Sequence, residues 1–333
     1  MKNLFTTMLQ LSTKRLIILA VITAGVFVKM NGRPQPTTPA DVAEARAVGF
    51  LMREVPAWSK NNGCFSCHNN GDAARALYAA TRKGYRIPAD VLADTTAWLV
   101  RPNRWDQNKG DPGFSDKRLA NAQFAASLLA AFETGHVKDL RPLREAARKL
   151  AADQAADGAW KIDLANTLGS PATYGTHLAT WMALKTLKKA DDSGIADAVQ
   201  KSERWLHQAP PNNVLSAAVL LMTLAGDSDQ SARRKQEECL RLIHDAQTGD
   251  GGWGPYADSP PEPFDTAIAL LALAQVRDRH RVDGWIRRGR AFLAAQQNSD
   301  GSWPATTRPP GGESYAQQVS TTGWVTLALL ETR

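Results

Sequence analysis

Cysteine is scarce in this sequence, with three residues among 333, so a small fold held together mainly by disulfide bonds is excluded. Lysine and arginine never form a run of five or more. The net charge of +7 therefore indicates a solvated basic surface rather than a nucleic-acid-binding segment. With 24 glycines, 18 prolines and 43% hydrophobic residues, most of the chain is neither collagen-like nor disordered. The sequence predicts a globular protein without a nucleic-acid partner.

Long hydrophobic runs are also lacking, since no apolar stretch reaches the roughly 20 residues that a helix needs to cross a bilayer upright. The uncharged run Leu16–Val28 has 13 residues and follows two basic residues, as in a secretory signal. No A-x-A cleavage site follows it. Residues 1–30 are therefore predicted to be a signal or an N-terminal membrane anchor, with 14–30 held in the inner membrane.

The ten residues 31–40 contain three prolines and are predicted to form an extended linker. The folded body is then expected over 41–333, and the export signal places it in the periplasm or elsewhere outside the cytoplasm.

A repeated Q-x-x-D-G-x-W pattern is the most specific long-range signal in the sequence. Its copies span 154–160, 247–253 and 297–303, and their starts lie 93 and 50 residues apart. A period in the high forties is typical of repeat arrays. Asp-Gly favours a tight turn, so the pattern predicts a structural turn between helices rather than a catalytic site.

The segments around these turns alternate in character. An amphipathic segment precedes each turn, and a segment that is apolar on nearly every face follows it. Two further pairs lie upstream, 41–60 with 72–84 and 88–101 with 119–133, which gives six helix–loop–helix units. Helices that are apolar all round are buried all round. The prediction is an all-α fold, an α/α toroid with the apolar helices inside, and an open solenoid is the alternative.

The stretch GRAFLAAQQNSDGSW, from Gly289 to Trp303, resembles the QW motif of squalene–hopene cyclases and the related prenyltransferase repeats. The resemblance extends over 41–333 and is strongest in the last two units. It implies the α/α toroid. It does not by itself imply cyclase chemistry, because one fold supports many functions.

This sequence departs from the family at the catalytic positions. Class II cyclases of the family protonate their substrate from the middle aspartate of a D-x-D-D-T motif. The matching segment here is EPFDT, in which Phe264 occupies the position of the acid. Asp265 and Thr266 are predicted to cap the following helix, and Cys239 is predicted to be a free, partly buried thiol. No catalytic residue is assigned, and the sequence leaves open whether the chain is an enzyme.

The first unit carries C-F-S-C-H, Cys64 to His68, where later units carry the repeated turn. C-x-x-C-H is the attachment signature of c-type haem and resembles a c-type cytochrome over these five residues only. Cys64 and Cys67 are predicted to form the haem thioethers and His68 to be an axial iron ligand, within an attachment loop at 61–71. A zinc site, a thioredoxin-type dithiol and a simple Cys64–Cys67 disulfide are the alternatives.

The second axial ligand is predicted from the helix pairing. His177 lies one turn into its inner helix, on the same end of the array as His68, and Met182 lies one turn deeper. His177 is the first candidate and Met182 the second, and a five-coordinate iron is the alternative.

The leading functional hypothesis is an exported c-type haem protein with an electron-transfer or haem-based redox role. It implies haem c, iron and a redox partner of unknown identity, with a hydrophobic ligand expected in the toroid cavity. One alternative is a non-catalytic binding scaffold with a Cys64–Cys67 disulfide. Another is a terpenoid cyclase-like enzyme without the usual D-x-D-D acid, which the small number of aromatic residues in the inner helices disfavours.

Overall fold

In the part of the chain that the structure describes, six amphipathic helices alternate with six helices that are mainly buried. The amphipathic helices are α1 (Pro39–Asn62), α3 (Ala89–Leu99), α5 (Arg141–Ala152), α7 (Ala196–Gln208), α9 (Gln230–Asp245) and α11 (Arg279–Ala295). The others are α2 (Ala74–Arg82), α4 (Lys117–Glu133), α6 (Gly175–Ala190), α8 (Val214–Leu224), α10 (Pro263–Leu273) and α12 (Tyr315–Glu331). Short helices of other types are the π-helix η1 (Cys67–Ala73) and two 3₁₀ turns, η2 (Pro102–Gln107) and η3 (Ser193–Ile195).

The computed structural model describes residues 37–108, 117–162, 168–306, 308 and 314–333. The predicted signal or anchor and most of the predicted linker lie outside these residues, and α1 already begins at Pro39. No helix in the described ranges has both the length and the apolar character needed to cross a membrane.

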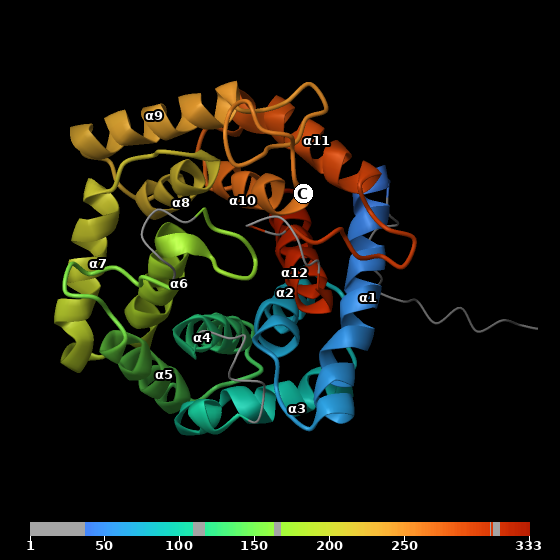
Figure 1. Ribbon diagram of the computed structural model, residues 1–333, viewed down its shortest axis with the longest axis vertical. Helices are drawn as coiled ribbons and strands as arrows, with labels where there is room; N and C mark the ends of the chain where they lie inside the picture. Colours follow the sequence, from blue (N-terminus) through green and yellow to red (C-terminus); the bar gives the residue numbers. More distant parts are fainter. Residues whose placement is uncertain (1–36, 109–116, 163–167, 307, 309–313) are drawn as a thin grey trace, which may run out of the picture. The chain divides into compact units, whose positions relative to one another are not determined.

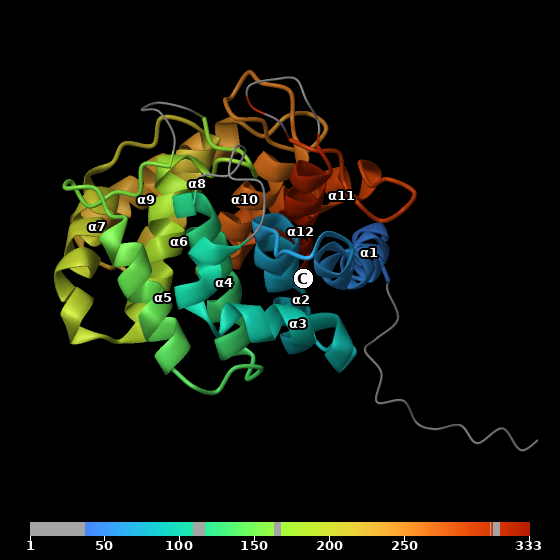
Figure 2. The same cartoon turned by 60° about the horizontal axis from the view of Figure 1, so that its bottom comes forward.

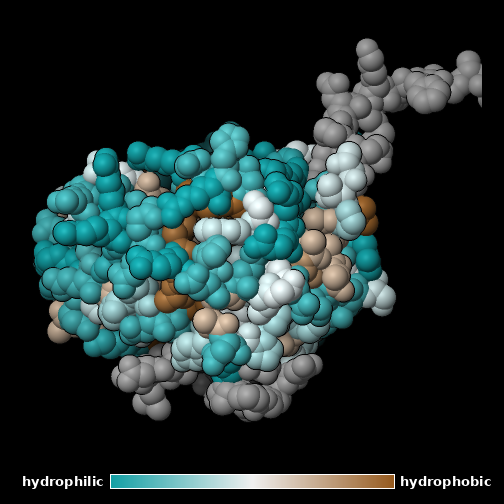
Figure 3. All heavy atoms as spheres, turned by 90° about the horizontal axis from the view of Figure 1, so that it is seen from above, coloured by the Kyte–Doolittle hydropathy of each residue, from teal (hydrophilic) through white to brown (hydrophobic). Residues whose placement is uncertain are grey.

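Within residues 37–333 the helices form two concentric rings (Figure 1). Each inner helix contacts the next, and α12 returns to contact α2 while α11 contacts α1. Every residue of α10 from Phe264 to Leu273 is buried, which explains why its sequence has no polar face. The outer surface over α9 and α11 is mainly hydrophilic (Figure 3). The predicted all-α toroid is confirmed, and the open solenoid is wrong because the ring closes.

The glutamine of the repeated turn links one outer helix to the next by hydrogen bonds. Gln247 Nε2 donates to the carbonyl of Gly251 at 2.8 Å and to that of Trp285, in α11, at 3.0 Å. The glycines of the three copies have φ of 100°, 89° and 98°, so the predicted tight turn is confirmed. The other two glutamines make the same pair of bonds: Gln154 to Gly158 and Ala198, and Gln297 to Gly301 and Ala43.

The tryptophan of the turn joins the outer layer to the inner layer. Trp253 Nε1 donates to the Ile243 carbonyl of α9 at 2.6 Å, and its backbone N–H donates to Thr266 Oγ1 of α10 at 2.9 Å. Trp160 and Trp303 repeat both contacts, with Leu150 and Thr180 and with Leu293 and Thr322. These turns gather at one end of the ring, and the short connections from inner to outer helices lie at the other (Figure 2).

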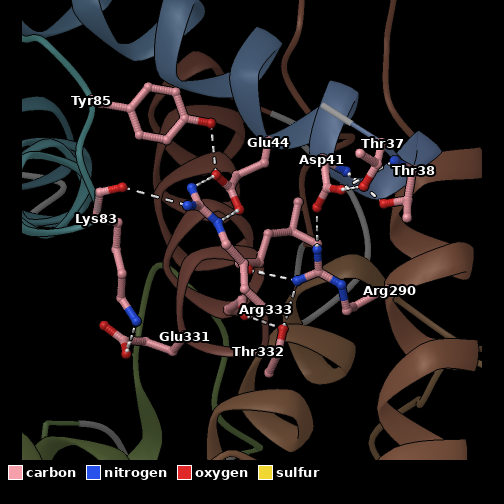
Figure 4. Close-up of polar contacts among 12 residues, drawn as sticks. Thr37, Thr38, Asp41, Glu44, Lys83, Tyr85, Arg290, Glu331, Thr332 and Arg333 are labelled. Carbon is pink, nitrogen blue, oxygen red and sulfur yellow. Dashed lines mark hydrogen bonds and ion pairs between the residues drawn. The ribbon is translucent and has the colours of Figure 1, made fainter. Parts of the chain in front are cut away.

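Ion pairs from both ends of the described chain close the ring (Figure 4). Arg290 of α11 donates to Asp41 of α1 at 3.0 Å, and to Thr332 Oγ1 after α12 at 3.0 Å. Arg333 pairs with the fully buried Glu44 of α1. Three helices that are distant in sequence are thereby joined through charged groups.

Candidate functional site

The C-x-x-C-H segment forms the turn between α1 and η1. Gly63 ends α1 in the left-handed region with φ of 64°, and Ser66 Oγ accepts from the backbone N–H of His68 at 3.1 Å. Gly71 packs against α4, where an added Cβ would lie 2.9 Å from Gln123 Cβ. Helix capping and helix packing therefore account for both glycines without a bound macrocycle.

Two asparagines hold this turn where the later units use glutamine. Asn70 Oδ1 accepts from Ser66 N at 2.9 Å, and Asn70 Nδ2 donates to Thr95 Oγ1 of α3 at 2.8 Å. Asn69 Nδ2 donates to Tyr315 Oη of α12 at 2.9 Å. The first unit thus makes the same kind of link to the next outer helix with different residues.

Burial favours the neutral forms of Cys67 and His68. All three cysteines are free, with Cys64 and Cys67 partly buried and Cys239 buried. Burial raises the pKa of Cys67 to about 12 and lowers that of His68. The Nδ1 atom of His68 is buried without a hydrogen-bond partner. The prediction of a free thiol at Cys239 is confirmed.

The two candidate second ligands lie in different surroundings. The His177 ring packs against Trp205 of the outer helix α7 with centroids 5.0 Å apart, and burial lowers its pKa to about 4. Met182 points to the interior of the ring, where its Sδ accepts from Arg75 Nη1 at 3.3 Å. Neither contact tests an axial role, so both assignments stay predictions.

A buried carboxylate, Asp72, lies at the centre of the ring at the end of η1. Its Oδ2 accepts from Gln123 Nε2 of α4 at 2.7 Å and from Ser320 Oγ of α12. Its Oδ1 accepts from Tyr174 Oη, and Arg75 Nη2 lies 3.8 Å from the same oxygen. Three donors from separate parts of the chain therefore fix the carboxylate in place.

Tyr174, which precedes α6, has φ of 62°, an uncommon value for a residue with a side chain. Its hydroxyl bond to Asp72 and an edge contact with Trp324, at 5.5 Å between centroids, hold it there. Burial and the neighbouring carboxylate raise the pKa of Tyr174 well above its usual value, so it remains a donor.

A cavity of about 500 Å³ occupies the interior of the ring, at the end where the inner helices terminate. Its deep end is formed by Arg75 and Trp324, whose guanidinium and ring lie 3.9 Å apart. Apolar and polar residues share the wall, and the apolar ones include Leu129, Trp181, Met182, Leu271 and Leu327. Ion pairs surround the cavity toward its mouth: Arg82 with Glu331, Lys188 with Glu203 and His207 with Asp227.

Asp265 of the EPFDT segment lies near the start of α10. The cavity is lined by Leu271, near the other end of this helix. The carboxylate of Asp265 pairs with Arg308, which also pairs with Glu262 at 3.0 Å. Burial raises the pKa of Asp265 to about 7, and its Oδ1 has no hydrogen-bond partner. The capping role predicted for Asp265 and Thr266 is wrong, because Glu262 is the N-cap residue and Thr266 binds Trp253 instead.

A hydrophobic ligand in the toroid cavity was expected from the sequence, but no role was assigned to Asp72 or Arg75. Asp72 was read only as the start of an inner helix. The available signal was an arginine inside an otherwise apolar helix, three residues after an aspartate. Such a charge on a fully buried helix needs a partner inside the ring.

Comparison with known proteins supports the fold described above. No protein-family model matches the sequence. A stretch of 103 residues is 35% identical to drimenyl diphosphate synthase of Streptomyces showdoensis, covering 30% of this chain and 19% of that enzyme. The chain thus spans about a fifth of the length of the curated relative that it matches.

Solved structures resemble the whole toroid at low sequence identity. The type II terpene cyclase MstE of Scytonema, as its R337A variant with geranylgeranyl dihydroxybenzoate, has a TM-score of 0.57 at 13% identity, over 88% of this chain and 97% of that one. An unsaturated glucuronyl hydrolase specific for heparin has a TM-score of 0.59 at 12% identity, over 88% and 96%. At such identities the likeness shows the fold alone. The chain has a terpene cyclase-like, all-α toroid fold.

These findings correct the functional hypothesis drawn from the C-x-x-C-H segment. The classification of this chain as a c-type cytochrome with metal-binding and electron-transfer function is wrong. Within the described residues no group of three or more His, Cys, Asp or Glu side chains is placed to hold a metal ion. The matching stretch of sequence belongs instead to drimenyl diphosphate synthase, and the fold is the terpene cyclase-like toroid. Whether Cys64, Cys67 and His68 carry a covalent group is a separate prediction that no contact described here tests.

Proposed function

We propose that this chain is a terpenoid cyclase-like enzyme that encloses an isoprenoid chain in its central cavity. The observation that carries the proposal is the cavity itself. Its volume of about 500 Å³ lies in the range of small-molecule sites. Apolar side chains form about half of its wall, and two indole rings, Trp181 and Trp324, belong to it. Indole faces stabilise positive charge, and each of these rings already has a protein cation beside it, Lys185 at 4.7 Å and Arg75 at 3.9 Å. The partial match to a terpenoid-forming enzyme supports the same substrate class.

The proton donor for such a reaction has to touch the bound ligand. Phe264 occupies the position of the usual acid and packs against Trp324, with centroids 5.9 Å apart. Asp265 does not line the cavity. Of the carboxylates that do, Glu203, Asp227 and Glu331 are held in ion pairs, whereas Glu133 forms none with the residues that the structure describes. We assign the role to Glu133 because it is the cavity carboxylate that no cation holds in such a pair.

Ligand binding tests the first part of this proposal. Farnesol and geranylgeraniol should quench the fluorescence of the cavity tryptophans and saturate. Ala130→Trp places an indole in the cavity and should abolish binding. The matched control, Ala152→Trp, lies on the exposed end of α5 and should bind as the wild type does. Equal, unsaturable quenching in all three proteins would contradict the proposal.

Turnover tests the second part. Gas chromatography with mass spectrometry of reactions with isoprenoid alcohols and phosphates should show cyclised products. Glu133→Gln should lower the rate at least about a hundredfold, as is typical for loss of a general acid, while Asp265→Asn should leave the rate nearly unchanged. The opposite order would transfer the acid role to Asp265, and absence of products with every substrate would reduce the proposal to isoprenoid binding.

The binding-scaffold alternative depended on a Cys64–Cys67 disulfide. Both thiols are free in the structure, so no observation favours it.

A further inference from the structure

Arg75 is a buried cation whose hydrogen-bonding capacity is mostly unused. The residue is 7% exposed, yet it lines the central cavity from its position on α2. Its guanidinium lies against the Trp324 ring at 3.9 Å, and one nitrogen donates to Met182 Sδ at 3.3 Å. Its Nε and Nη2 atoms are buried and have no hydrogen-bond partner. Buried donors of this kind are rare and costly in folded proteins, and ligands often satisfy them.

The nearby aspartate does not satisfy these donors. Asp72 Oδ1 lies 3.8 Å from Arg75 Nη2, which is beyond hydrogen-bond distance. The same carboxylate already accepts bonds from Gln123, Tyr174 and Ser320. Asp72 therefore balances the charge of Arg75 and fixes its position, while the N–H groups of Nε and Nη2 remain available.

Lys185 of α6 is a second cation in the cavity, with its Nζ 4.7 Å from the centre of the Trp181 ring, and it has no carboxylate at ion-pair distance among the described residues. Burial is the main cause that lowers the pKa of Lys185. The charge of Glu133 raises this pKa, and the charge of Arg75 lowers it. By contrast, the cations toward the mouth are paired, Arg82 with Glu331 at 2.5 Å and Lys188 with Glu203 at 2.8 Å. The available positive charge is thus inside the cavity.

We propose that Arg75 and Lys185 bind the anionic group of the cavity's ligand, a phosphate or a carboxylate attached to an isoprenoid chain. This inference rests on the proposed function for the isoprenoid part alone. The anionic group lies at the deep end against Arg75, where a planar guanidinium binds two oxygens at once. The apolar chain then extends along Leu129, Leu271 and Leu327 toward the mouth and reaches Glu133.

Titrations with four probes test this inference. Farnesyl phosphate, farnesoic acid, farnesol and inorganic pyrophosphate are each titrated into the full chain while tryptophan fluorescence is followed. Both anionic lipids should bind roughly tenfold to hundredfold more tightly than farnesol, the usual effect of charge-assisted hydrogen bonds. Tight binding of the phosphate alone would restrict the ligand to phosphorylated isoprenoids.

Substitutions of Arg75 test whether this residue causes the preference for anionic ligands. Arg75→Met should remove the preference for anions, leaving farnesol binding within about threefold, and Arg75→Lys should restore part of it. Arg287→Met, on the exposed face of α11, is the matched control and should bind as the wild type does. Circular dichroism checks folding. If Arg75→Met does not fold, Lys185→Met serves as the second variant and should weaken binding of both anionic lipids.

The outcomes separate this inference from the proposed function. Equal affinity for farnesol and the anionic lipids would overturn the anion site and leave the isoprenoid cavity standing. Pyrophosphate binding that depends on Arg75, without binding of any farnesyl compound, would support the anion site and overturn the isoprenoid proposal. Loss of anion preference in the Arg287→Met control would also overturn the assignment to Arg75.

Discussion

At the residue scale, Arg75 and Asp265 show two ways in which a fold accommodates a charge inside a ring of apolar helices. Arg75 has Asp72 at 3.8 Å and the face of the Trp324 ring at 3.9 Å from its guanidinium. Asp265 has Arg308 as a partner, but one of its oxygens is left without a hydrogen bond. Burial therefore outweighs the ion pair and raises its pKa to about 7.

The raised pKa of Asp265 predicts how stability depends on pH. The folded protein holds this proton up to about pH 7, whereas the unfolded chain releases it near the usual value of about 4. The contribution of Asp265 to the free energy of unfolding should therefore be greatest at low pH. It should fall as pH rises from about 4 to 8, by at most about 4 kcal/mol.

Urea unfolding of the wild type and of Asp265→Asn at several pH values measures this contribution. The asparagine variant should show a flatter profile than the wild type across that window. Parallel profiles would mean that Asp265 is ionised in the folded state throughout.

At the element scale, the repeated turn links successive helices through hydrogen bonds. Its glutamine reaches a carbonyl of the next outer helix, and its tryptophan reaches the outer helix behind and the inner helix ahead. The helix pairs were predictable from sequence because this turn and its flanking periodicity are local. The classification as an electron-transfer cytochrome failed for a related reason: it rested on five local residues, and the rest of the chain does not support it.

The turn at 297–303 predicts a matched pair of variants. Gln297 donates to the Ala43 carbonyl at 2.7 Å and to the Gly301 carbonyl at 3.0 Å, whereas the neighbouring Gln296 is exposed. Gln297→Ala should lower the free energy of unfolding by about 1–3 kcal/mol, because two carbonyls lose their donor. Gln296→Ala should change it by less than about 0.5 kcal/mol. Denaturant unfolding measures both changes. Equal effects of the two substitutions would contradict a role of Gln297 in linking the outer helices.

At the scale of the whole molecule, the sequence predicted the toroid but not its interior. The donors that surround Asp72 come from positions 51, 102 and 248 residues away along the chain. No local pattern joins Gln123, Tyr174 and Ser320, so only the closed ring brings them together. The wall of the expected cavity likewise combines residues of all six inner helices and of α7.

Closure of the ring predicts a large effect for one arginine. Arg290 binds Asp41, the Leu329 carbonyl and Thr332, and is 9% exposed. Arg290→Met should destabilise the protein by about 3–5 kcal/mol, since it leaves the partly buried Asp41 without its cation. Hydrogen exchange should rise first in α1 and α12. Arg287→Met on the same helix is the control, and exchange that rises evenly over all helices would contradict a closing role.

The meeting of α1 with α11 and α12 also constrains how the chain folds. In an open repeat array each unit gains its neighbour as soon as that neighbour forms, so assembly can proceed stepwise from one end. Here α1 packs against residues about 250 positions further along the chain. The hydrogen bond from Arg46 to the Asn298 carbonyl is an example. Contacts at such separations slow folding. During synthesis the apolar edge of the first unit therefore stays uncovered until the last helix emerges, and this interval is when the protein is most exposed to aggregation.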